Sequence, residues 1–146
     1  MNWKEYIENQ KSNSFSFCFY DLATNAQIAE SEGKIRIIFP DELKELYSQT
    51  DGAGIKLNEF PDMGIMDYLL FPLEYLVEYN LLFHKNWTAE KHLLFVAPHG
   101  NGDYYGYEVV YGEIVSTQIY KWDHEDDSSE LYSNSLAEFI ERVLNW

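Results

Sequence analysis

The sequence predicts an α+β fold in which helices flank an antiparallel β-sheet, and three observations predict it. Apolar residues recur at helical spacing in the first half of the chain, most clearly over 40–52 and 72–81. Strand-like alternation interrupted by tight-turn residues dominates 93–122. A strongly amphipathic helix is then expected at 135–144. Helices packed on an antiparallel strand meander satisfy all three observations.

Length and composition fit a single domain. The chain has 146 residues, of which 46% are apolar and 17% aromatic. This is enough to bury one core and is below the size at which cores usually split. We therefore expect one domain over 1–146, with residues 1–23 as an N-terminal helix and extension.

The N-terminal part carries helix and strand signals in alternation. Trp3, Tyr6 and Ile7 have the i, i+3, i+4 spacing of a short amphipathic helix. Partial alternation over 15–20 predicts a strand, and Thr24 can cap the helix that follows it.

Proline marks the start of two further helices. Pro40 suits the first turn of a helix that Gly52 can terminate, and Pro72 begins another. Strand-like stretches at 55–57 and 66–71 lie between them. These segments complete the helical half of the fold.

The second half predicts three consecutive antiparallel strands. The continuous apolar run 93–97 reads as a central strand covered on both faces. Residues 99–103 tolerate a tight turn, and 104–111 alternates as a strand that pairs back. A further turn leads to a third strand at 115–122.

The last helix has the clearest start signal. Ser135 and Glu138 have the spacing of a capping box, in which each side chain satisfies a free backbone amide. Glu138 and Arg142 can pair on its wet face. Its apolar face comprises Leu136, Phe139, Ile140, Val143 and Leu144.

The charge balance excludes several function classes. Asp and Glu number 25 against 10 Lys and Arg, a net charge of −15. Nucleic acids and anionic membranes are disfavoured partners, because both are held largely by basic side chains. Cys18 is the single cysteine, so no internal disulfide or thiolate metal cluster can form. Without a signal peptide or membrane span, we expect a cytoplasmic protein.

Three segments, read in order, resemble the SUKH superfamily. Residues 38–47 with Asp51-Gly52 resemble its opening helix and turn, and 94–105 resembles its strand, Gly-rich turn and Asp signature. Residues 119–127 resemble its strand ending in Tyr-x-Trp-Asp-His-Glu, and 135–140 its terminal helix. The resemblance extends from about Thr24 to Leu144.

This resemblance implies a fold and a class of function. The superfamily includes yeast Smi/Knr-type cell-wall regulators and bacterial immunity proteins that bind and block a co-encoded toxin. It implies an α+β fold with an antiparallel sheet flanked by helices, and no catalytic residues. We expect an immunity protein that is a monomer or weak homodimer and neutralises a basic toxin, such as a nuclease, by occluding its active cleft. A regulatory or scaffolding adaptor of the Smi/Knr type is the alternative.

The densest chemical cluster is the acidic run 123–127, with Glu130 close behind. A divalent-metal site is one interpretation, since hard cations bind clustered oxygens, but the run lacks the alternation and central glycine of a calcium loop. General acid–base chemistry by His124 with Asp103 is another, but the sequence shows no nucleophile beside them. A solvated acidic loop is the interpretation that we favour, so no metal, cofactor or catalytic residue is assigned.

The preferred interpretation of this region is a partner-binding surface. Residues 101–146 hold ten acidic side chains and, among basic ones, Lys121 and Arg142. A field of that sign steers a basic partner. The residues assigned to binding are four loop acids that steer, two further acids and two aromatic anchors: Asp123, Glu125, Asp126, Asp127, Asp103, Glu108, Tyr104 and Trp122.

Other conspicuous residues are interpreted structurally. Tyr105, Tyr107 and Tyr111 alternate onto one apolar face and are expected in the core. Asn80 lies at i+7 of a helix face and is expected to be a buried amide bonded to backbone. His84 has no neighbour that suggests a metal pair.

Overall fold

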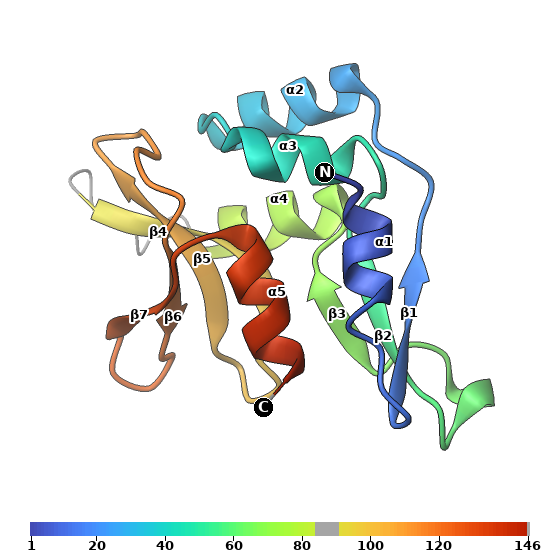
Figure 1. Ribbon diagram of the computed structural model, residues 1–146. Helices are drawn as coiled ribbons and strands as arrows, with labels where there is room; N and C mark the ends of the chain where they lie inside the picture. The colour runs from blue at the N-terminus through green and yellow to red at the C-terminus, as the bar shows by residue number, and fades with distance from the viewer. Residues whose placement is uncertain (84–90, 146) are drawn as a thin grey trace.

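The computed structural model describes residues 1–83 and 91–145 (Figure 1). His84, discussed above, lies outside this range. The elements follow one another as α1 (Trp3–Glu8), β1 (Phe15–Phe19), α2 (Asn25–Ile35), α3 (Asp41–Tyr47), β2 (Ala53–Leu57), η1 (Pro61–Met63), β3 (Asp67–Leu70), α4 (Leu73–Phe83), β4 (Lys91–Pro98), β5 (Tyr104–Val110), β6 (Ile119–Trp122), β7 (Ser129–Ser133) and α5 (Leu136–Leu144).

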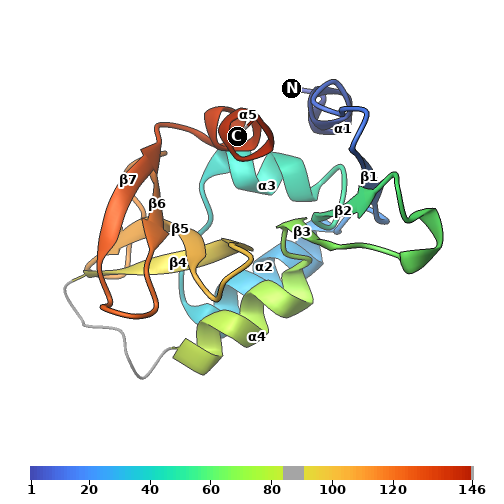
Figure 2. The same cartoon turned by 90° about the horizontal axis from the view of Figure 1, so that it is seen from below.

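The strands form two antiparallel sheets, which confirms the predicted α+β class. The first has the order β1-β2-β3 and the second the order β4-β5-β6-β7. They meet where the Phe71 amide, just after β3, donates to the Val96 carbonyl of β4 at 2.9 Å. Helices α2 and α4 pack on each other on one side of the sheets, while α5 and α1 lie on the other (Figure 2).

The helix starts follow from local capping. Thr24 Oγ1 accepts the Gln27 amide at 3.1 Å while the Gln27 side chain accepts the Thr24 amide at 2.8 Å, a complete capping box for α2. Ser135 likewise accepts the Glu138 amide at 3.1 Å, as predicted. The Glu138 carboxylate accepts the Asn134 amide instead of the Ser135 amide, so the expected box closes one residue earlier.

Three elements meet at a partly buried carboxylate near the core. Glu42, in the first turn of α3, accepts the Tyr107 hydroxyl of β5 at 2.9 Å and the Leu136 amide of α5 at 3.1 Å. Burial raises the pKa of Glu42, and these two hydrogen bonds oppose the rise. Leu43, Tyr107 and Phe139 are fully buried around this junction. The core is therefore shared by α3, the second sheet and α5.

Several strand predictions were wrong. The run 93–97, predicted as a central strand, lies in β4 at the edge of the second sheet, although its residues are buried as expected. The predicted strand 115–122 is confined to Ile119–Trp122. After the acidic run 123–127 the chain returns as a fourth strand, β7, which had not been predicted. Tyr111, predicted to be in the core, is 74% exposed and has a φ of 49°. It lies just past β5 in the turn to β6, so the alternation of the strand no longer applies there.

No described helix is long and apolar enough to cross a membrane. Cys18 lies half-buried in β1, where it is a free thiol.

Candidate partner-binding surface

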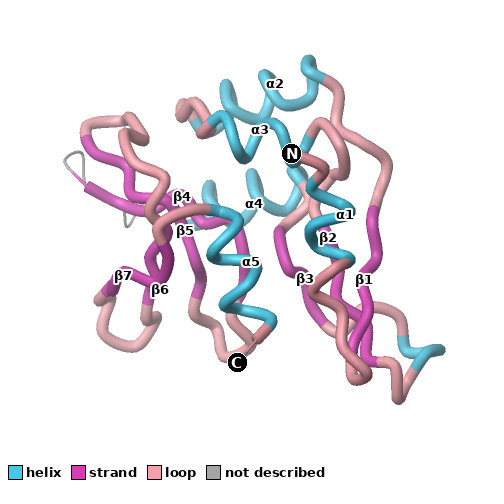
Figure 3. The backbone as a smooth tube through the Cα atoms, in the orientation of Figure 1, coloured by secondary structure: helices cyan, strands magenta, loops and turns pink. Residues whose placement is uncertain are grey.

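The β6–β7 connection places most of the predicted acidic residues at one end of the second sheet. Figure 3 shows it as a loop between two strands. It is closed by the Asp123 amide donating to the Ser128 carbonyl at 2.8 Å and the Asp127 amide donating to the Asp123 carbonyl at 3.0 Å. Asp127 has a φ of 58°, the left-handed conformation that Asp tolerates better than most residues. We name residues 123–128 the acidic loop.

Carboxylates hold the acidic loop in shape. Asp123 accepts the Glu125 amide at 2.8 Å, and Asp127 accepts the indole N–H of Trp122 at 2.6 Å. Asp126 accepts the Ser128 amide and hydroxyl at 3.0 and 2.6 Å, and these bonds hold its pKa below the usual range. Glu125 is exposed and has no side-chain partner among the described residues. The loop is thus pre-formed while its charges remain at the surface.

Asp103 and His124 join the β4–β5 turn to the acidic loop. Asp103 Oδ1 accepts the His124 amide at 3.1 Å and lies 2.6 Å from His124 Nδ1. The Asp103 residue is 5% exposed, whereas the His124 side chain is 41% exposed. The hydrogen bond raises the pKa of His124 and lowers that of Asp103, so an ion pair is favoured. The two titratable groups are therefore in contact. Asp103 is buried, and its carboxylate is occupied by His124.

The same corner brings together atoms that could ligate a metal ion. One ligand atom each from Asp103, Asp123 and His124 lies within 4.8 Å of the others. Two of the three carboxylate and imidazole groups already bond each other, and Asp123 accepts a backbone amide. Internal hydrogen bonds therefore account for the cluster, and we assign no metal to it.

Tyr104 and Trp122 form a pair on one face of the second sheet. They are directly opposite in the β5–β6 register, and their ring centroids are 6.1 Å apart at an interplanar angle of 27°. The buried ring of Phe95 lies beneath both, 5.0 Å from Tyr104 and 5.2 Å from Trp122. Both outer rings stay half-exposed next to the acidic loop. The structure therefore brings the two predicted anchors together with the loop acids.

Glu108 does not join this group. It lies four residues after Tyr104 on the same strand, about 13 Å further along β5. Its carboxylate forms an ion pair with Lys91 of β4 at 3.1 Å. If Glu108 contacts a partner, it does so at a position away from the acidic loop.

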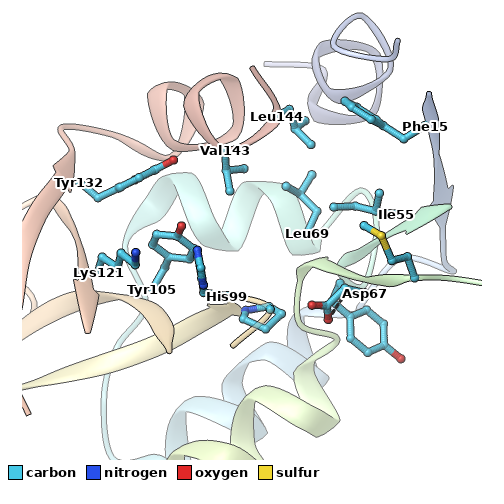
Figure 4. A pocket seen from close by; sticks show the side chains of 14 residues that line it. Phe15, Ile55, Asp67, Leu69, His99, Tyr105, Lys121, Tyr132, Val143 and Leu144 are labelled. Atoms are coloured by element: carbon cyan, nitrogen blue, oxygen red, sulfur yellow. Dashed lines mark hydrogen bonds between the residues drawn. The ribbon is translucent and has the colours of Figure 1, made fainter. Parts of the chain in front are cut away.

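A cavity of about 570 Å³ lies on the opposite face of β5 (Figure 4). It lies between α5, the first sheet and the β4–β5 turn, and its lining includes Tyr105, Lys121, His99 and Asp67. Its size suits a small ligand, but the lining contains none of the predicted binding residues. Tyr105 and Tyr107, predicted to be in the core, are 3% and 0% exposed on this face.

Sequence reasoning missed the contribution of α4. Tyr79 and Phe83 approach Tyr104 with centroid distances of 6.1 and 5.5 Å. Tyr75, Tyr79 and Phe83 recur at i, i+4 and i+8, a spacing that places them on one helix face. That aromatic stripe was a usable signal, although the sequence does not show which sheet face it borders.

Comparison with known proteins supplies a family for this arrangement. Residues 25–140 match the family model SUKH_6, described as SMI1-KNR4 cell-wall. A search of curated proteins found no match.

Proposed function

Because this chain belongs to the SMI1-KNR4 family of the SUKH superfamily, we propose that it is an immunity protein that binds and neutralises a cognate toxin. Family membership supports a role of the immunity or Smi/Knr type. One observation carries the more specific proposal. A pre-formed acidic loop borders a pair of half-exposed aromatic rings, Tyr104 and Trp122, on a chain of net charge −15.

The arrangement divides the work of binding between two kinds of side chain. Glu125, Asp126 and Asp127 create a negative field that accelerates encounter with a basic partner. Charge at an exposed rim adds little lasting affinity, so buried anchors must slow dissociation. Tyr104 and Trp122 are the aromatic residues beside the loop, and rigid packing lowers the entropy that they lose on binding.

The expected target is a toxin with a basic active cleft, such as a nuclease. A nuclease cleft binds phosphates, and carboxylates held on a rigid loop present similar negative charge. This protein would then inhibit by occupying the cleft. It needs no catalytic residue of its own, and we propose that it is not an enzyme.

A scaffolding role of the Smi/Knr type is the second candidate, and the cell-wall description of the matching family favours it. In that case the same surface would recruit housekeeping proteins. The two candidates differ in whether the partner is poisonous on its own.

The test begins with affinity capture of the tagged chain from its source organism, followed by mass spectrometry. The recovered partner is then expressed alone and together with this chain. The immunity proposal expects growth arrest by the partner alone, rescue by co-expression and inhibition of its purified activity at a 1:1 ratio. A partner that is harmless when expressed alone would contradict it and support the adaptor role.

The inhibition assay also has matched variants. Glu125→Gln with Asp126→Asn removes two loop charges while the Asn oxygen preserves the acceptor that Ser128 needs. Glu59→Gln with Asp62→Asn removes two exposed charges beside the first sheet. We expect weaker inhibition at limiting concentration from the first variant only.

A further inference from the structure

The Tyr104–Trp122 pair is one end of a continuous row of aromatic rings. From Tyr104 the row continues to Tyr79, Tyr75 and Tyr68, with successive centroid distances of 6.1, 6.3 and 5.6 Å. It crosses β6, β5, α4 and β3, because α4 runs along one side of both sheets (Figure 2). We name Tyr68, Tyr75, Tyr79, Tyr104 and Trp122 the aromatic row. Tyr75 is 37% exposed, and the other four rings are half-buried.

Buried rings support the aromatic row from below. Phe71 is 3% exposed and lies 5.0 Å from Tyr79 and 6.1 Å from Tyr104. Phe95 is 4% exposed and supports Tyr104 and Trp122. Rings held in this way lose little conformational freedom when a partner binds, which is the property of a pre-organised binding surface.

Carboxylates border the aromatic row at its two ends. Asp67 directly precedes Tyr68, and its charge contributes, after burial and Tyr79, to raising the pKa of Tyr104. Asp127 bonds the Trp122 indole at the other end. The border is therefore negative at both ends. Glu74 and Glu78 are exposed elsewhere on α4 and add to the negative charge of that helix.

Positive charge is missing from the elements that carry most of the row. The sequences of β3, α4 and β5 contain no lysine or arginine. In β6, Lys121 lies opposite Tyr105 and lines the cavity, which Asp67 and Tyr68 also line at its far side beside the first sheet. The negative charge of the bordering carboxylates is therefore not balanced by basic side chains in β3, α4 or β5.

We propose that the aromatic row binds arginine side chains presented by a segment of the partner protein. A guanidinium group stacks on tyrosine and tryptophan faces and donates paired hydrogen bonds to carboxylates, and this surface offers both. Lysine satisfies the charge but cannot stack as a plane. Single-stranded nucleic acid also stacks on aromatic rings, but the bordering carboxylates repel its phosphates. The inference rests on the proposed function for the existence of a protein partner.

A peptide titration tests this proposal without the natural partner. The ¹⁵N-labelled chain is titrated with a synthetic peptide of alternating arginine and glycine, with a lysine–glycine peptide, and with a peptide in which uncharged citrulline replaces arginine. We expect the arginine peptide to shift the Trp122 indole resonance and to bind about three- to tenfold more tightly than the lysine peptide. The citrulline peptide should bind more weakly than both.

Two matched tyrosine variants locate the binding. Tyr75→Asn removes a ring that is 37% exposed within the row, and Tyr111→Asn removes one that is 74% exposed in the β5–β6 turn. Asn tolerates the positive φ of position 111, so the control should fold normally. We expect arginine-peptide affinity to fall several-fold in the first variant and to stay unchanged in the second. Equal affinity in the wild type and Tyr75→Asn would overturn the proposal.

The outcomes also separate this inference from the proposed function. A toxin that is inhibited equally by the wild type and by Tyr75→Asn combined with Tyr79→Asn would refute the aromatic row and leave the immunity role standing. Arginine-specific binding at the row together with a partner that is harmless when expressed alone would support the row and refute the immunity role.

Discussion

At the scale of single residues, Asn80 connects α4 to β4, the edge strand of the second sheet. It is 0% exposed, and its Nδ2 donates to the Leu76 and Phe95 carbonyls at 2.7 and 2.8 Å. Its Oδ1 accepts the Phe95 amide at 2.9 Å. One side chain thereby satisfies both backbone groups of Phe95, the residue that supports Tyr104 and Trp122.

Asn80→Ala should therefore be strongly destabilising. The substitution leaves a buried amide and a buried carbonyl without this partner, which costs about 2–4 kcal/mol in the free energy of unfolding. Urea denaturation measures the loss. Asn58→Ala is the control, because the Asn58 amide bonds backbone carbonyls at an exposed position. Equal losses of unfolding free energy in both variants would show that the buried hydrogen bonds of Asn80 do not contribute more to stability than exposed ones.

The Asp103–His124 contact predicts a pH-dependent contribution to stability. Because the pKa of His124 is raised on folding, its contribution is complete below about 6.5, its usual unfolded value, and is lost as pH rises through the higher folded value. Because the pKa of Asp103 is lowered, its contribution is present above about 3.9 and is lost as pH falls through the lower folded value. The ion pair is therefore most stabilising at pH 4 to 6.5.

His124→Gln tests this dependence. The difference in unfolding free energy between the wild type and this variant should be largest near pH 5.5 and smaller at pH 3 and pH 9. The backbone amide of residue 124 can still donate to Asp103, so the loop should keep its anchor. A difference that is constant with pH would mean that the side-chain contact does not titrate.

Residue-level prediction succeeded where a side chain belongs to a regular element. Tyr105 and Tyr107 are buried because strand alternation reaches them, and Asn80 is buried because helix periodicity does. The prediction that Tyr111 is buried was wrong, because β5 ends one residue earlier and the chain turns there. The sequence suggested that Asp103 and His124 could meet, but it did not predict that Asp103 is buried, because a lone acid in a turn gives no signal of burial.

At the scale of elements, Gly52 controls the junction between α3, β2 and the start of α4. The sequence predicted that it terminates a helix, but α3 already ends at Tyr47. Gly52 has a φ of 79°, and a Cβ there would lie 2.7 Å from the Leu70 carbonyl oxygen and the Pro72 nitrogen. The glycine therefore permits two chain segments to pass in close contact.

Gly52→Ala should destabilise the protein well beyond the cost of its backbone conformation. A left-handed φ costs a non-glycine residue about 1–2 kcal/mol, and the backbone clash adds to this. Gly112→Ala is the matched control, because Gly112 has a φ of 81° but nothing within 4 Å of the added Cβ. Calorimetry should show a clearly lower Tm for the first variant than for the second. Similar Tm values would mean that the junction relaxes without cost.

The helices could be predicted from sequence more fully than the sheets. Caps at Thr24 and Ser135 and the apolar stripes set the helices with local information. β7 escaped prediction because four of its five residues are half-exposed or exposed, so no alternation marks it within an acidic segment. The pairing of β1 with β2 joins residues about forty positions apart, which periodicity does not specify.

At the scale of the whole molecule, part of the candidate site is formed by neighbouring strands and part by elements that are distant in sequence. Tyr104, Trp122 and the acidic loop could be predicted together, because adjacent antiparallel strands bring a turn and its flanking rings to one end of the sheet. The tyrosines of α4 and β3 join them only because α4 packs along one side of both sheets. The spacing of residues in the sequence does not predict that packing.

The charge of the whole chain predicts how the partner associates. With a net charge of −15, association with a basic partner should be fast at low salt and slow steeply as ionic strength rises. Stopped-flow or surface plasmon resonance at 20 to 500 mM salt measures both rate constants. Glu125→Gln with Asp126→Asn should lower the association rate several-fold at low salt and flatten its salt dependence, while the dissociation rate changes little.

Trp122→Ala should do the opposite, because it removes a ring packed on Phe95 and Phe83. Dissociation should accelerate about tenfold or more, while the salt dependence of association stays near that of the wild type. Circular dichroism and urea denaturation must first show that the variant is folded, since the indole also bonds Asp127 of the acidic loop. If the acidic variant instead accelerates dissociation and Trp122→Ala slows association, the two roles are reversed, because rim charge and buried surface act on different steps of binding.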